Sequence, residues 1–194
     1  MAANPIADST QHFLTELPAE EREQAEQAML RDSVRAEGVD MSLADEINLA
    51  KAIKCVAGAD GLSREELVGL KYLLIISGLP PAFQQHILDF DASTTRVDDV
   101  AALFPAASRK ACYVLSGTTT VAALDGLSDE ERDFSIELGA SLGLPPTLVE
   151  LLIAEARATG LAMHDGNQGM VTELMRLREA IYDFAFEAPV RPPG

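Results

Sequence analysis

Two short acidic clusters at matching places in the chain are the residues best suited to chemistry. Each cluster is an Asp-Gly turn followed by a Glu-Glu pair, and the acids are Asp60, Glu65, Glu66, Asp125, Glu130 and Glu131. Hard divalent cations prefer oxygen ligands, and an Asp in a turn can lie near two Glu residues in the next helical turn. The six acids therefore predict a site for calcium or magnesium, within one loop or shared between the two.

The same residues also have a purely structural interpretation. Asp-Gly favours a tight turn, and Ser63 with Glu66, like Ser128 with Glu131, has the spacing of a helix capping box. In such a box the serine oxygen accepts from an early N–H, and the glutamate accepts from the N–H of the cap residue. A leucine follows each Asp-Gly, where a complete calcium loop would place a ligand, so an ion would need carbonyls, water or the other cluster. The residue types alone allow both interpretations.

The two clusters belong to a longer repeat with an offset of 65 residues. Residues 56–66 and 121–131 are identical at eight of eleven positions, and the Gly-Leu-Pro-Pro of 78–81 recurs at 143–146. This predicts an internal duplication of a unit made of a helix, a D-G turn, a capped helix, a G-L-P-P stop and a further helix. With only two units, a compact bundle with a pseudo-twofold axis is favoured over an open solenoid.

Apolar residues recur at helical spacing, and no segment alternates polar and apolar residues as a strand would, so the chain is predicted to be all-α. The expected helices run from Pro18 towards Gly38, from Ser42 onwards, over 63–77 and over 128–142. The segment 108–123 holds a Gly and three Thr, which are poor helix formers, but the repeat aligns it with the helix before Asp60. The core is predicted to include Leu70, Leu73, Leu74, Phe134, Leu138 and Leu142.

Four segments are expected along the chain. They are an acidic N-terminal helical extension over 1–42, the duplicated helical domain over 43–160, a C-terminal loop and helix packing on the bundle over 161–187, and a flexible tail over 188–194. Within the third segment, a loop after Gly160 is expected to hold His164, Asp165, Gly166 and Asn167.

The charge balance limits the classes of partner. The 194 residues include 31 acids against 15 Lys and Arg, a formal charge of −16. Such a field repels nucleic acid and anionic membrane surfaces, and no apolar run is long enough for membrane insertion. Cations and basic protein surfaces are the expected partners, and a homo-oligomer is compatible with the composition. The first residues lack the features of a signal peptide, so a cytoplasmic, soluble protein is expected.

No catalytic constellation is legible in the sequence. Cys55 and Cys112 have no metal-ligand spacing and are expected to be small buried hydrophobes. His12, His86 and His164 fall in no metal or protease motif and are expected on the surface or in loops. The chain is therefore predicted not to be an enzyme.

The doubled D-G-x-S-x-E-E unit, each copy followed by G-L-P-P, resembles the TerB-like tellurite-resistance family over residues 43–158. The resemblance implies a cytoplasmic helical bundle linked to tellurite and related metal or chemical stress, associated with other stress-response proteins and without an established catalytic activity. The chain departs from the pattern where Leu124 replaces the alanine before the second Asp, and where both ends extend beyond the motif region.

Three hypotheses follow from these patterns. The first is a non-enzymatic TerB-like stress-response protein that acts as a metal-responsive or scaffolding module. The alternative is an acidic helical protein-interaction module whose D-G loops are purely structural. The third is an enzyme that uses clustered carboxylates for acid–base or metal-assisted chemistry. It ranks last because the sequence shows no base–nucleophile constellation.

Overall fold

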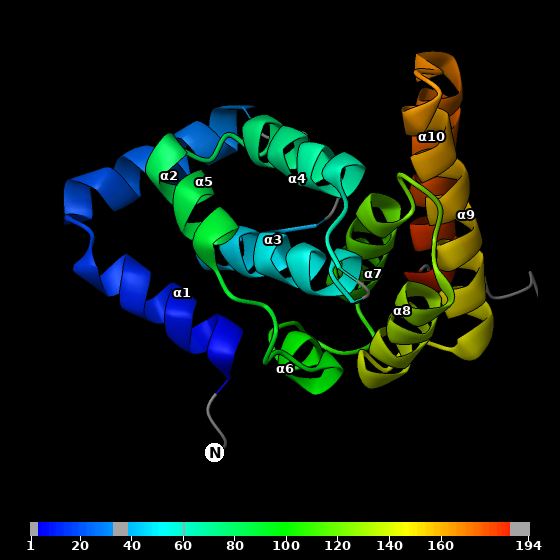
Figure 1. Cartoon of the computed structure of the whole chain (residues 1–194), viewed down its shortest axis with the longest axis horizontal. Helices are drawn as coiled ribbons and strands as arrows, with labels where there is room; N and C mark the ends of the chain where they lie inside the picture. Colours follow the sequence, from blue (N-terminus) through cyan, green and yellow to red (C-terminus); the bar gives the residue numbers. More distant parts are fainter. Residues whose placement is uncertain (1–3, 33–38, 60, 187–194) are drawn as a thin grey trace, which may run out of the picture.

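The computed structural model describes residues 4–32, 39–59 and 61–186, and within them every regular element is a helix (Figure 1). The all-α prediction is therefore confirmed. In chain order the helices are α1 (Pro5–Glu16), α2 (Ala19–Asp32), α3 (Leu43–Ala57), α4 (Arg64–Ile76), α5 (Pro81–Asp89), α6 (Val97–Ala101), α7 (Arg109–Ala122), α8 (Asp129–Ser141), α9 (Pro146–His164) and α10 (Gln168–Phe186). None of these helices has the length and apolar character that crossing a bilayer requires.

The centre of the bundle is the packed pair α3 and α7 (Figure 1). Nearly all of α3 is buried, and α7 buries the three threonines that are poor helix formers in isolation. Their hydroxyls are satisfied locally or across the core: Thr118 and Thr120 donate to carbonyls of the preceding turn, and Thr119 donates to Ser135. Tertiary burial thus offsets the low helix propensity of this segment.

The outer helices add the predicted apolar stripes to this core. Of the predicted core residues, four are almost fully buried: Leu70, Leu74, Leu138 and Leu142. Leu73 and Phe134 are only partly buried against the core, so that part of the prediction is wrong. They lie at the edge of the buried stripe, because each helix is covered on one side only.

The N-terminal extension is made of two helices. The side chain of Asn4 caps α1 by accepting from the N–H groups of Ile6 and Ala7. α1 packs on α3, where the fully buried Lys51 donates to the hydroxyls of Ser9 and Thr10 at 2.9 and 3.0 Å. The predicted end of the next helix near Gly38 lies outside the described residues.

Helices α9 and α10 lie side by side at one end of the molecule (Figure 1). The loop expected over residues 164–167 is confirmed for 165–167, but it begins one residue later because α9 continues through Gly160 to His164. A Cβ at position 160 would lie only 2.7 Å from the carbonyl oxygen of Ala123, so this glycine serves close packing within a helix. The predicted boundary at residue 160 therefore falls inside α9.

A buried ion pair fastens α10 to the bundle. The Arg178 guanidinium donates to both carboxylate oxygens of Glu155 on α9, at 2.8 and 3.1 Å, and to the Thr120 hydroxyl on α7 at 2.9 Å. Tyr182, one turn further along α10, is fully buried. Three helices therefore meet at this contact.

Candidate functional site: a buried carboxylate pair

The two D-G turns and the helix starts after them have nearly the same geometry. Gly61 and Gly126 have φ angles of 115° and 109°, a region that favours glycine because it has no Cβ. At the start of α4, Glu66 N–H donates to the Ser63 hydroxyl at 3.1 Å, and Ser63 N–H donates to Glu66 Oε2 at 2.7 Å. This is the capping box that the sequence predicts.

The start of α8 repeats this arrangement. Glu131 N–H donates to the Ser128 hydroxyl at 3.2 Å, and Ser128 N–H donates to Glu131 Oε2 at 2.8 Å. Both predicted capping boxes are therefore confirmed, and each uses one carboxylate oxygen of its glutamate.

The two capping glutamates, Glu66 and Glu131, also lie close to each other, which the sequence does not reveal. Glu66 and Glu131 are only 1% and 2% exposed, although they come from separate helix starts. Glu66 Oε1 is buried and has no hydrogen-bond partner in the described chain. The Glu131 carboxyl lies close enough to Glu66 to raise its pKa. Two carboxyl groups can share a hydrogen bond only if one of them holds a proton.

The environment of this pair favours that proton. Burial is the largest cause that raises the pKa of Glu66, followed by the hydrogen bond to Glu131 and repulsion by its charge, and together they bring it to about 8. The capping bond from Ser63 acts in the opposite direction but is the smaller effect. A raised pKa of this kind favours one proton on the Glu66–Glu131 pair near neutral pH.

The remaining predicted ligands do not join this pair in the described residues. Glu65, Asp125 and Glu130 are exposed, and Asp60 lies outside the described residues. Across the described part of the chain, no three His, Cys, Asp or Glu side chains are grouped as metal ligands. The structure thus brings together Glu66 and Glu131, and their oxygens are of the type that suits a hard cation.

The contact between the two glutamates could not be found from either motif alone. A local capping box accounts for each glutamate by itself, whereas their contact depends on how α4 and α8 approach each other. The sequence held one signal, the equal offset of 65 residues, because equivalent residues meet wherever a twofold axis passes between them. Asp45 and Lys110 are a second pair at this offset, joined by a 2.9 Å ion pair.

The predicted environments of the histidines and cysteines are partly confirmed. Cys55 and Cys112 are buried and unpaired, and burial raises the pKa of each thiol to about 11, which disfavours a thiolate nucleophile. His86 differs from its predicted surface location: its ring is stacked on Phe13, with centroids 4.0 Å apart. Burial lowers the pKa of His86 to about 4, and the nearby Lys51 adds to the effect.

Comparison of the chain with protein-family models, curated proteins and solved structures found no match.

Proposed function

We propose that this chain is a non-enzymatic, TerB-like stress-response protein of the cytoplasm whose buried Glu66–Glu131 pair responds to a proton or a divalent cation. The observation that carries the proposal is the buried Glu66 Oε1, which has no hydrogen-bond partner in the described chain and belongs to a carboxyl whose pKa the neighbouring Glu131 raises. A chain that needed these residues only for capping would have no requirement for two buried carboxyl groups in contact.

The proposal includes an internal duplication with a pseudo-twofold axis near the pair. Three kinds of local geometry match at the offset of 65: the capping boxes, the G-L-P-P stops with Gly78 and Gly143 at φ 73° and 71°, and the prolines Pro81 and Pro146 that begin the following helices. The contacts between Glu66 and Glu131 and between Asp45 and Lys110 further support such an axis.

The pair would act by changing the relation between α4 and α8. With one shared proton, the carboxyl groups attract each other, whereas without it two buried negative charges repel. A divalent cation such as calcium or magnesium would replace the proton and draw both carboxylates towards itself, with water or the D-G loops completing its shell. Loss of the proton or binding of a cation would therefore change how α4 and α8 pack where the two halves of the bundle meet.

The test is a titration with calcium and with magnesium. Binding is measured by calorimetry, and stability is measured by thermal unfolding. We expect the folded parent to gain stability with cation concentration by mass action, and binding to release a proton. Glu66→Gln should lose most of this effect, while the matched control Glu65→Gln, one residue away and exposed, should keep it. The double variant Asp60→Asn, Asp125→Asn keeps the turns and tests whether the loops contribute charge.

Absence of saturable binding at millimolar cation, or an equal response from Glu66→Gln, would remove the metal part of the proposal. The second candidate, an acidic helical interaction module with structural D-G loops, would then replace it. That candidate is favoured by the apolar side chains exposed on α4 and α9. A carboxylate-based enzyme ranks third, because the sequence shows no base–nucleophile constellation.

A further inference from the structure

Helix α1 covers a lysine that has no acidic partner. Lys51 on α3 is fully buried, and its Nζ donates to the hydroxyls of Ser9 and Thr10 on α1, at 2.9 and 3.0 Å. The ammonium also lies 4.9 Å from the centre of the Phe90 ring. Among the described residues, no carboxylate lies within ion-pair distance of Lys51. Hydroxyls and a ring offset only part of the free energy that burying a cation costs.

The rest of the chain shows that such an unpaired cation is not required by packing or by composition. Lys110, which is more exposed than Lys51, pairs with Asp45 at 2.9 Å, and the chain has 31 acids. At the offset of 65, the position equivalent to Lys51 holds Ser116, which is also fully buried. A neutral side chain therefore fills the matching place in the second half of the bundle.

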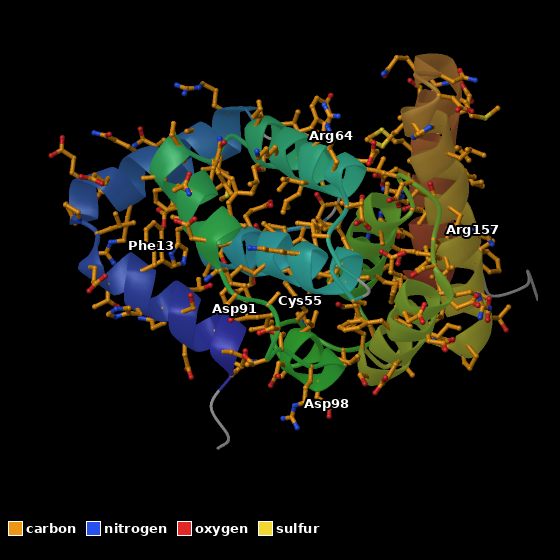
Figure 2. The ribbon with its side chains drawn as sticks, viewed as in Figure 1. Phe13, Cys55, Arg64, Asp91, Asp98 and Arg157 are labelled. Carbon is orange, nitrogen blue, oxygen red and sulfur yellow. The ribbon has the colours of Figure 1, made fainter. Side chains whose placement is uncertain are left out.

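The contacts that hold α1 in place are few. Its buried residues are Ile6 and Thr10. Phe13 lies between α1 and α5 (Figure 2), where its ring meets Phe83 edge-on and stacks on His86. A helix with so few buried side chains can open locally while the rest of the protein stays folded.

The connection between α1 and α2 allows α1 to move as a unit. Leu17, directly after α1, has extended backbone, and Pro18 follows it, so the first helix does not continue into the second. Near its start, α1 is tied to the loop side of the bundle by Asn4, whose Nδ2 donates to the carbonyl oxygen of Asp99 at 2.8 Å.

We infer that α1 is a pH-sensitive strap, which docks over Lys51 more tightly when this lysine loses its proton. Opening of the strap exposes the Lys51 ammonium to water and uncovers the Phe83 side chain that contacts Phe13. This device lies apart from the Glu66–Glu131 pair and does not depend on the proposed function.

The direction of the pH dependence follows from the burial of Lys51. Burial lowers the pKa of Lys51 from 10.5 to about 8, and opening of α1 returns the pKa towards 10.5. The cost of docking is therefore fully present below pH 8 and disappears as the pH rises towards 10.5.

The other groups that face Lys51 stay neutral where it titrates. They are Cys55 on α3 and His86 on α5, while α1 presents hydroxyls. Burial raises the pKa of Cys55 to about 11 and lowers that of His86 to about 4. Between pH 7 and pH 9, the charge in the docked state therefore changes at Lys51.

The test is hydrogen exchange of α1 at pH 7 and pH 9, corrected for the intrinsic exchange rate at each pH, with α7 as the reference for global unfolding. We expect the opening constant of α1 in the parent to be about tenfold smaller at pH 9 than at pH 7. In Lys51→Met this constant should be at least about tenfold smaller than in the parent at pH 7, and it should not fall further at pH 9. Lys71→Met, which removes an exposed lysine from α4, is the matched control and should behave as the parent does.

A second variant supplies the missing carboxylate instead of removing the cation. Ser9→Asp should also reduce opening at pH 7, and its opening should change less with pH, because an ion pair raises the pKa of Lys51 again. This variant keeps the inference testable even if Lys51→Met fails to fold.

Equal opening of α1 in the parent and in both variants at pH 7, or an equal fall with pH in all three, would overturn the inference. The same conclusion would follow if α1 and α7 exchanged with the same free energy of opening, because α1 would then open only with the whole bundle. Glu66→Gln should leave the opening of α1 unchanged, so failure of the proposed function can be told apart from failure of this inference.

Discussion

Replacing Glu66 by Gln should make the stability of the protein less dependent on pH. The parent glutamate takes up a proton on folding because its pKa rises from 4.5 to about 8. A carboxyl whose pKa is raised in the folded state contributes stability that is fully present below pH 4.5 and is lost as the pH rises through about 8. Glutamine keeps the oxygen that caps α4, and its amide N–H can donate permanently to Glu131, so this loss should disappear.

The size of the effect follows from proton linkage. One pKa unit corresponds to about 1.4 kcal/mol, so a group with a pKa near 8 should cost the parent on the order of 2 kcal/mol of unfolding free energy between pH 6.5 and pH 8. Below pH 6.5 the lowered pKa of His86 acts in the opposite direction, because its contribution is lost as the pH falls towards 4. The lowered pKa of Lys51, about 8, adds a small opposing effect near the upper limit. Both groups are shared by parent and variant, so the difference between the two proteins isolates the Glu66–Glu131 pair.

The assay is urea unfolding of both proteins at half-unit steps from pH 6.5 to pH 8, with Glu65→Gln as the exposed control. We expect the parent and the control to lose stability by the amount above, relative to Glu66→Gln. Parallel curves for the parent and Glu66→Gln would refute the reasoning, since they would show that no proton is held between the two carboxyl groups.

Three further predictions concern the fold. Leu138→Ala should cost about 2–5 kcal/mol in urea unfolding by leaving a cavity, whereas Leu73→Ala, only partly buried, should cost clearly less; equal losses would mean that the burial of α4 is misjudged. Arg178→Ala should cost about 3–5 kcal/mol by leaving Glu155 buried and unpaired, and should increase hydrogen exchange in α10; unchanged exchange would show that α10 is held by its apolar contacts alone. Gly160→Ala should lower the melting temperature despite alanine's higher helix propensity, because its methyl group would meet the backbone of a neighbouring loop; a higher melting temperature would contradict that close packing.

Residue types and short spacings are enough to predict the local features of this protein. The capping boxes at Ser63 and Ser128 and the glycine turns depend on bonds between residues at most a few positions apart, so residue type and spacing are enough to predict them. Helical periodicity likewise predicted the all-α class, and the repeat predicted that α7 is helical despite its threonines.

Which helix faces meet depends on the packing of the whole bundle. The capping interpretation uses one oxygen each of Glu66 and Glu131, and nothing within either motif specifies that the other oxygens are buried together. In the same way, a domain boundary was predicted at Gly160, but this glycine lies inside α9, where it packs closely against Ala123. Contacts between residues far apart in the chain depend on how whole helices pack, so a pattern of local spacings does not contain them.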